Sequence, residues 1–588
     1  MARTFDYLVP EALAASVRVG TVVRVPLHGR RVRGWVVADD VVPEADPDRI
    51  VPVHKVVSAG PPPEVVALAH WAAHRWAGPV TAFLRAASPP VSVTATASPS
   101  PESALHPVSA PPTELGADWL DARVRVVTWP PAADRRGLVR AVCAPEGSTL
   151  VLVPEPARAG ALVRSIAEEG REVLHHHSDL TDRARAAIWD ATRHGARVVV
   201  GGRAAVWLPI PDLAAVVVLD EIDESFQDER APTWHARDVA VERAVRAGAS
   251  ITLVSPAPSP EARATPGAVA VTPDGRRLRA GWPQLEVVDV RDDPPGTGIC
   301  SLALGPAIHR ALDAGGRAIV VVNRKGRARL LACRACAALA RCTTCGAAVG
   351  QPDDVLECPR CAATRPPVCG ECGATRFRPV RPGVHAVRDD VAALVPRTPV
   401  ADVDAATDAV GDEAVLVGTE AVLHRVLRGS RPPVRLVAFL AFDEELLAPR
   451  YRAHAQALWL LVRGARLLGG RADGGRLLVQ TRMPDHPVLR AARTGDPTDL
   501  VAEDTAVRRA LAFPPFGAVA EVSGVAAAVA LAANALRAAG LAVTGGEDGP
   551  ALVRSPSPDA LADGLAATDL GPARGLGRLR VAVDPPRV

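Results

Sequence analysis

Four C-x-x-C pairs lie between Cys333 and Cys372, and they constrain the fold of this chain more than any other feature of its sequence. They contain eight of its ten cysteines. A C-x-x-C turn places two sulfurs on one side of a tight loop, and two such turns supply the four thiolates of a closed tetrahedral zinc site. Eight sulfurs therefore predict two zinc ions. Because the segment has few large apolar residues, we expect metal, at roughly 10 to 16 kcal/mol of apparent binding per zinc, to hold it together.

The loop lengths between the pairs indicate which pairs share an ion. The two inner pairs are separated by a loop of ordinary ribbon length, which leaves the outer pairs to close around them. In this nested hypothesis, zinc 1 is bound by Cys333, Cys336, Cys369 and Cys372, and zinc 2 is bound by Cys342, Cys345, Cys358 and Cys361.

Three other uses of these cysteines are disfavoured. The N-terminus lacks the apolar core of a secretory signal, so we expect a cytoplasmic protein, in which disulfides are rare. A redox C-x-x-C needs a thioredoxin-like setting and does not occur four at a time. Iron–sulfur clusters use other spacings.

Length and composition limit the remaining possibilities. A chain of 588 residues predicts three to five domains, and without an apolar run of 18 residues we expect no membrane span. The formal net charge of +3 is nearly balanced, so contacts with nucleic acid must come from local arginine clusters. Only two lysines occur, Lys55 and Lys325.

Hydrophobic patterning predicts an α/β chain with several parts. Short apolar segments at 21–26, 33–38 and 51–56 predict a small N-terminal β domain, and a helix follows over 63–76. Residues 87–117 are rich in Ser, Pro, Thr and Ala, which predicts a flexible linker. Buried-strand runs alternating with helical stretches then predict two parallel-sheet lobes, with the cysteine module inserted in the second. These runs are 149–153, 197–200, 215–219, 251–254, 318–322, 414–417 and 436–440.

Short motifs occur in a fixed order along the chain: RTFDYL at 3–8, LVPE at 152–155, HSDL at 177–180, GGRAA at 201–205, DEID at 220–223, WHARD at 234–238, NRKG at 323–326, QT at 480–481, DHP at 485–487 and LAFPP at 511–515. With the four cysteine pairs, this order resembles the PriA family of bacterial replication-restart helicases over almost the whole chain. The family nests its two zinc sites in the way inferred above.

The resemblance implies a division of the chain into seven segments. They are an N-terminal 3′-end DNA-binding-like domain (1–86), the linker (87–117), a degenerate helicase lobe 1 (118–275), the first part of a helicase-like lobe 2 (276–332), the zinc module (333–372), the second part of lobe 2 (373–485) and a C-terminal domain (486–588).

In the family, an aspartate in the FDY motif recognises the base at the free 3′ end of a nascent strand. The resemblance assigns this role to Asp6, with Phe5 and Tyr7 shaping the pocket. The alternative is that Phe5 and Tyr7 are core residues of a β domain.

The motor motifs of the family are damaged in this chain. A phosphate loop must end in Gly-Lys-Ser/Thr, but neither lysine follows a glycine, and Trp129, Pro130 and Pro131 stand where the loop should open lobe 1. Ser255-Pro256-Ala257 stands in place of the family's Ser-Ala-Thr motif. His424 and Arg425 stand where the family has a lysine and a glycine. The arginines of the family's arginine-finger motif are rearranged over residues 463–471. We therefore predict no useful ATPase.

Asp220 and Glu221 follow a buried strand at the position of the family's magnesium-binding acidic pair. They are candidates to bind ATP and magnesium and to position water. The alternative is that this acidic pair is a structural remnant.

The leading hypothesis is a replication-restart protein that has lost its motor and acts as a DNA-binding scaffold at stalled forks. Its expected partners are DNA (forks, nascent 3′ ends and single strands), primosome proteins and single-strand DNA-binding protein. Arg324, Arg327 and Arg329 are candidates for phosphate contact or for a solvated basic face. Phe226 and Trp234 are candidates for stacking on unpaired bases or for burial between the lobes.

Two other functions remain open at this point. One is an ATP-dependent 3′-to-5′ DNA helicase with an altered nucleotide site. The other is a zinc-ribbon interaction protein without a role on DNA.

Overall fold

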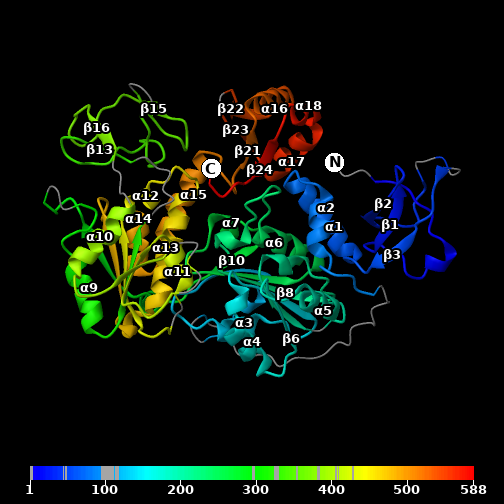
Figure 1. Cartoon of the computed structure of the whole chain (residues 1–588), viewed down its shortest axis with the longest axis horizontal. Coiled ribbons are helices and arrows are strands. Elements are labelled where there is room, and N and C mark those ends of the chain that lie inside the picture. Colours follow the sequence, from blue (N-terminus) through cyan, green and yellow to red (C-terminus); the bar gives the residue numbers. More distant parts are fainter. Residues whose placement is uncertain are drawn as a thin grey trace.

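A computed structural model describes most of the chain (Figure 1). The described residues are 4–43, 46, 49–94, 112, 115, 118–195, 197–294, 298–322, 330–351, 355–379, 384–403, 407, 410–426, 429–547 and 549–587. Across these ranges, no helix combines the length and the apolar character that crossing a membrane requires. The candidate arginines Arg324, Arg327 and Arg329 lie outside the described residues.

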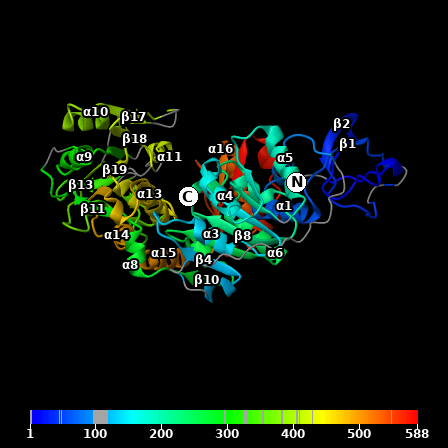
Figure 2. The ribbon, with the colours of Figure 1, turned by 90° about the horizontal axis from the view of Figure 1, so that it is seen from below.

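The N-terminal part is a three-stranded antiparallel sheet at one end of the molecule (Figures 1 and 2). Its strands are β1 (Val22–Leu27), β2 (Arg30–Trp35) and β3 (Lys55–Ser58), in the order β2-β1-β3. Val23, Val25 and Val53 form a small core of their own. His28 and Gly29, both with positive φ, make the tight β1–β2 turn, so β2 begins three residues earlier than the sequence predicts.

Lobe 1 is a seven-stranded sheet of parallel pairs in the order β10-β4-β9-β8-β5-β7-β6. The central strand β8 is a run of Leu, Ala and Val, and β5 is buried at every residue, which is what helices on each side of a parallel sheet require. The elements are β4 (Val124–Thr128), α3 (Arg136–Val142), β5 (Ser148–Leu152), α4 (Gly160–Ala167), β6 (Val173–His176), α5 (Asp182–Thr192), β7 (Val198–Gly201), β8 (Leu213–Leu219), α6 (Ala236–Ala247), β9 (Ser250–Ser255), α7 (Pro260–Arg263) and β10 (Ala268–Val271).

Lobe 2 is a six-stranded parallel sheet in the order β11-β20-β19-β12-β18-β17. The cysteine module lies between β12 and β17 in the sequence, which confirms the predicted insertion. The elements of the lobe are α8 (Gly275–Ala280), β11 (Gln284–Asp289), α9 (Leu304–Asp313), β12 (Arg317–Val322), α10 (Val384–Leu394), β17 (Val400–Val403), β18 (Val415–Gly418), α11 (Ala421–Arg425), β19 (Val434–Leu440), α12 (Asp443–Leu446), α13 (Ala453–Leu468) and β20 (Arg476–Thr481). Two helices of the segment that follows, α14 (Pro487–Thr494) and α15 (Thr498–Ala510), pack against its core.

Two smaller parts complete the fold. The cysteine module contains two two-stranded ladders, formed by β13 (Leu331–Cys333) with β16 (Phe377–Pro379) and by β14 (Leu356–Glu357) with β15 (Thr364–Arg365). The C-terminal region is a four-stranded antiparallel sheet, β22-β23-β21-β24, with three helices. Its elements are β21 (Ala518–Gly524), α16 (Ala526–Ala538), β22 (Ala542–Gly545), β23 (Ala551–Ser555), α17 (Pro558–Ala567), α18 (Gly571–Gly575) and β24 (Leu579–Val583).

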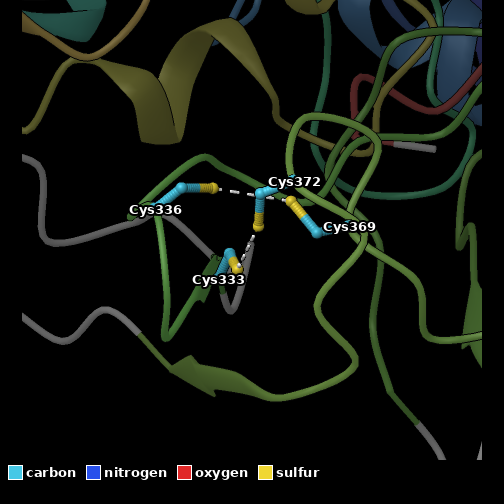
Figure 3. Close-up of side chains that lie close together, drawn as sticks. All are labelled: Cys333, Cys336, Cys369 and Cys372. Carbon is cyan, nitrogen blue, oxygen red and sulfur yellow. Dashed lines mark hydrogen bonds between the residues drawn. The ribbon is translucent and has the colours of Figure 1, made fainter.

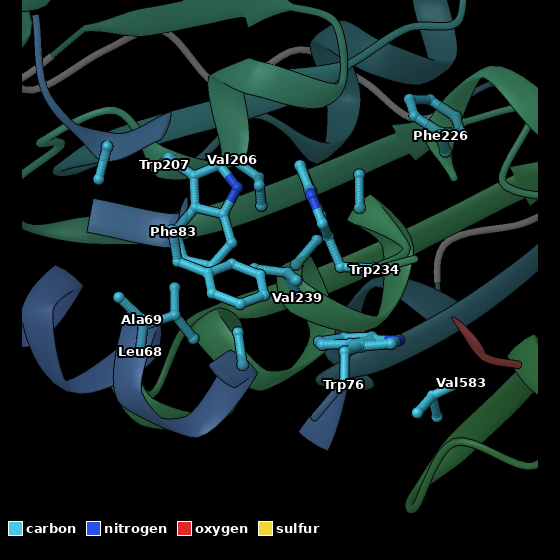
Figure 4. Close-up of a cluster of buried hydrophobic side chains, with 14 of the residues drawn as sticks. Leu68, Ala69, Trp76, Phe83, Val206, Trp207, Phe226, Trp234, Val239 and Val583 are labelled. Carbon is cyan, nitrogen blue, oxygen red and sulfur yellow. The ribbon is translucent and has the colours of Figure 1, made fainter. Parts of the chain in front are cut away.

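One apolar cluster joins three of these parts (Figure 4). It contains side chains of α1 (Pro63–Arg75) and α2 (Val80–Ala87), of lobe 1 and of the C-terminal sheet. The Trp207 ring lies 5.5 Å from the rings of both Phe83 and Trp234. Trp234 is 7% exposed and Phe226 is 0% exposed, so the structure buries both candidate stacking residues. Both side chains belong to this apolar cluster, and Trp234 packs against Trp207 of lobe 1. They are therefore not buried between the two lobes.

We expect Phe83→Ala to weaken the docking of α1–α2 on lobe 1. The ring is fully buried between Trp207 and α1, and truncation of a buried phenylalanine costs roughly 3 to 5 kcal/mol. Hydrogen exchange should therefore accelerate through 63–87. Val245→Ala, at a 67% exposed position on α6, is the control that should leave exchange unchanged. Equal exchange in the two variants would contradict this packing.

Candidate functional site

The structure brings the eight cysteines of the module together in two groups of four, and Figure 3 shows the group that contains Cys333. The groups are Cys333, Cys336, Cys369 and Cys372, and Cys342, Cys345, Cys358 and Cys361, with sulfurs within 4.8 Å of one another in each. These are the two sets of the nested hypothesis.

The sulfur–sulfur distances fit a metal and not a disulfide. The Sγ atoms of Cys333 and Cys372 are 3.6 Å apart, and those of Cys345 and Cys358 are 3.5 Å apart. A disulfide requires about 2.05 Å, whereas four thiolates about 2.3 Å from a tetrahedral zinc lie about 3.8 Å from one another. Each group could therefore hold a metal ion after a small outward movement of its sulfurs.

The backbone of each C-x-x-C turn is built to aim its sulfurs inward. The residue after each second cysteine has a positive φ: Ala337, Gly346, Ala362 and Gly373. Two of the four are alanines, for which this conformation costs about 1 to 2 kcal/mol. In two of the turns, the amides of Ala335 and Thr344 donate to the sulfurs of Cys333 and Cys342, both at 3.4 Å.

The two groups differ in their surroundings. The inner group is packed against lobe 2 and the C-terminal region: the amide of Ala348 donates to the Leu447 carbonyl at 2.7 Å, and the buried Arg360 guanidinium donates to the Tyr451 carbonyl at 3.2 Å. A hydrogen bond from the Cys345 thiol lowers the pKa of Cys358 to about 5, although burial opposes this. In the outer group, Cys336 and Cys372 are exposed.

The FDY residues lie at the edge of the small N-terminal sheet. Tyr7 packs against the small core and donates its hydroxyl to the Pro26 carbonyl at 3.0 Å, and burial raises its pKa. Phe5 is 46% exposed, and Asp6 is partly exposed. The structure therefore uses Tyr7 as a packing residue and presents Phe5 to the surface.

A cavity of about 660 Å³ lies between the lobes, beside the loop where a phosphate loop would be expected. Trp129 at the start of this loop is 5% exposed and packs into the core of lobe 1, and its amide donates to the Ser255 carbonyl at 3.0 Å. Pro130 and Pro131 contribute no amide donor. The loop therefore lacks the row of amides that cradles phosphates.

Both members of the acidic pair already have basic partners. Asp220 accepts from the guanidiniums of Arg135 at 2.6 Å and Arg466 at 2.8 Å. Burial alone would raise its pKa, but these two arginines hold it at about 2.

Glu221 is fully buried and accepts from the amide and hydroxyl of Ser259, at 2.7 and 2.9 Å, and from Arg237 at 3.2 Å. Burial is the largest effect on Glu221 and raises its pKa.

Asp220 belongs to a set of three ion pairs that cross from lobe 1 to lobe 2, which we name the lobe clasp. Its other pairs are Asp223 with Arg463 at 2.8 Å and Glu155 with His424 at 3.1 Å. All three carboxylates come from lobe 1, and all three bases come from lobe 2. The pKa of Glu155 falls to about 2 because His424 and Arg158 outweigh burial, and the hydrogen bond to Glu155 raises the pKa of His424.

The clasp was not predicted from the sequence, although one signal for it was available. The lobe 1 acids lie three residues apart, at 220 and 223, and the α13 arginines also lie three residues apart, at 463 and 466. Because α13 is a helix, arginines at this spacing lie on one of its faces. The same arginines were interpreted only as remains of an arginine finger, and Arg135 was not singled out.

Comparison with known proteins supports the resemblance to PriA proteins. The model of the PriA 3′ DNA-binding domain (3′BD) matches residues 1–89. Replication restart protein PriA of Treponema pallidum is 30% identical over 64% of this chain and 60% of its own length. The probable replication restart protein PriA of Mycobacterium tuberculosis is 29% identical over 97% of this chain and 89% of its own length. Over most of its length the chain is similar to PriA proteins.

The extent of the match differs among the PriA relatives. The alignments span 48 to 60% of the curated PriA proteins from Treponema pallidum, Haemophilus influenzae, Bacillus subtilis and Synechocystis, so this chain covers about half of these relatives. RecG bound to a three-way DNA junction matches at a TM-score of 0.34 and 12% identity, over 65% of this chain and 43% of RecG, which is too low for a structural argument.

We expect the double substitution Cys342→Ser and Cys345→Ser to remove one of two zinc ions. These sulfurs serve the inner group alone. Elemental analysis should find about two zinc ions per wild-type chain and about one in the variant. Cys143→Ser, at a buried cysteine outside the module, should keep both. Loss of neither ion, or of both, would refute the nested pairing.

We expect Arg466→Ala to loosen the lobes by roughly 2 to 4 kcal/mol, because it removes one of two guanidiniums from a buried carboxylate. Adding Asp220→Asn should recover part of this loss, since the amide carries no charge. Denaturant titration of the four proteins of this double-mutant cycle measures the coupling. Arg493→Ala, at an exposed position on α14, is the control. Additive effects of Arg466→Ala and Asp220→Asn would show that the pair is not coupled.

Proposed function

We propose that this chain is a DNA-binding replication restart protein that recognises stalled forks and acts as a loading scaffold without helicase turnover. The single observation that carries the second half of this proposal is the lobe clasp. A nucleotide site needs free cations for the phosphates and a free carboxylate for magnesium. Here Arg463 is paired with Asp223, and Arg466 is paired with Asp220. These cations and this carboxylate are therefore already occupied.

The first half of the proposal rests on the family. The 3′ DNA-binding domain model covers the segment that contains Phe5, Asp6 and Tyr7. We assign to Asp6 the recognition of the base at a free 3′ end, with Phe5 at the surface as a stacking partner and Tyr7 holding the segment against the core. Forks, nascent 3′ ends and single strands are the proposed DNA partners.

Two zinc ions are the proposed cofactors of the cysteine module. Four thiols in each group are the donor set of a structural zinc site, with no open position for a substrate. The inner zinc would fix the module on lobe 2 through Arg360 and Ala348, while the outer zinc would shape an exposed surface. Primosome proteins and single-strand DNA-binding protein are the proposed partners of that surface.

We also propose the following division of the chain: 1–86 for end recognition, 87–117 as a linker, 118–275 as lobe 1, 276–332 and 373–485 as lobe 2, 333–372 as the zinc module and 486–588 as the C-terminal domain. In this division α1 and α2 follow the N-terminal sheet in the sequence but pack against lobe 1. They therefore connect the N-terminal sheet to lobe 1.

One preparation of the chain tests both halves of the proposal. We expect no ATP hydrolysis above background, with or without DNA, and tighter binding to a fork with a 3′-hydroxyl than to one with a 3′-phosphate. Asp6→Ala should abolish this preference. DNA-stimulated hydrolysis that Asp220→Ala removes would instead support a helicase with an altered nucleotide site. Indifference of the wild type to the 3′ end would refute end recognition.

A further inference from the structure

The N-terminal sheet carries a row of cations across its strands. In the register of the sheet, Arg24 of β1 stands directly opposite Arg33 of β2 on one side and Lys55 of β3 on the other. Arg31 follows on the same face of β2, two residues from Arg33. Side chains directly opposite one another in antiparallel strands lie about 5 Å apart at Cβ. We name Arg24, Arg31, Arg33 and Lys55 the cation row.

The cation row lies on the face of the sheet away from the small core. Val23, Val25 and Val32 alternate with these residues and point into that core, and side chains of neighbouring residues in a strand point to opposite faces. Arg31, Arg33 and Lys55 are exposed, and Arg24 is partly buried.

Nothing in the described part of the chain neutralises this row. Its four residues have no acidic partner there, whereas arginines elsewhere, such as Arg237, Arg463 and Arg508, are paired with carboxylates. The Arg24 Nε–H is buried and has no hydrogen-bond acceptor. Like charges placed directly opposite one another destabilise a sheet, so a bound anion would relieve the repulsion within the row.

The row lies next to the segment that holds Asp6. The Leu8 amide donates to the Val51 carbonyl at 3.1 Å, and the Val53 amide donates to the Leu8 carbonyl at 2.9 Å. Residues 51–53 lead directly into Lys55 and β3, so the Asp6 segment and the cation row are parts of the same small sheet.

We propose that the cation row binds the internal phosphates of the DNA strand whose 3′ end is held by the same domain. This inference rests on the proposed end recognition and adds a second contact to it. A three-strand row spans about 10 Å, enough to face two or three successive phosphates. Contacts of this kind position the strand and do not depend on base sequence or on the end group.

Arg33 and Arg30 provide a matched test, because both are exposed arginines of β2 but lie on opposite faces of the sheet. Binding to forks with a 3′-hydroxyl and with a 3′-phosphate is measured by fluorescence anisotropy over a salt series. We expect Arg33→Gln to weaken both complexes by the same factor. The slope of log affinity against log salt should fall by about 0.7 to 0.9, the value for one lost phosphate contact.

Three further variants complete the design. Arg30→Gln should behave as wild type, Arg33→Lys should retain the salt slope because it keeps the charge, and Arg31→Gln should repeat the effect of Arg33→Gln. Equal weakening by Arg33→Gln and Arg30→Gln would overturn the cation row. If the wild type ignores the 3′ end while Arg33→Gln still lowers the slope, the proposed end recognition fails and the row stands. If the wild type binds neither fork, both fail.

Discussion

Charge complementarity between the two lobes decides what this fold can do. Three carboxylates of lobe 1, Glu155, Asp220 and Asp223, meet three bases of lobe 2 in the cavity between the lobes. Separating the lobes would let water solvate these charged groups, so the three ion pairs add little to the free energy that holds the lobes together. What the ion pairs determine is the relative position of the lobes, because every charge is paired in only one such position.

The rest of the molecule reinforces that fixed arrangement. A shared apolar cluster joins α1–α2, lobe 1 and the C-terminal sheet, and the tail after β24 adds polar contacts to both lobes. The Asp584 carbonyl accepts from Gln227 of lobe 1, and the Pro586 carbonyl accepts from Gln456 of lobe 2. The inner cysteine group is bonded to lobe 2 in turn. Contacts at all these points hold the parts of the molecule in one arrangement.

The sequence predicted the parts of this structure that depend on local pattern. The spacing of the cysteines predicted the two groups of four, and runs of buried aliphatic residues predicted many of the interior strands, although β4 and β20 were not among them. The edge strand β6 was not predicted, because Val173–His176 has only two apolar residues and is half-buried. The packing of α1–α2 on lobe 1 could not be predicted, since an apolar helix face indicates that the face is buried but not which element covers it. The lobe clasp was not predicted because its partners are more than 200 residues apart in the sequence.

Hydrogen exchange with and without Mg-ATP tests most directly whether the clasp has replaced the nucleotide. The account predicts that exchange in α13 and in the loop 129–135 is the same in both conditions, because the ion pairs already hold these segments together. Protection of both segments that appears only with Mg-ATP would show that nucleotide still closes the lobes, and would contradict it.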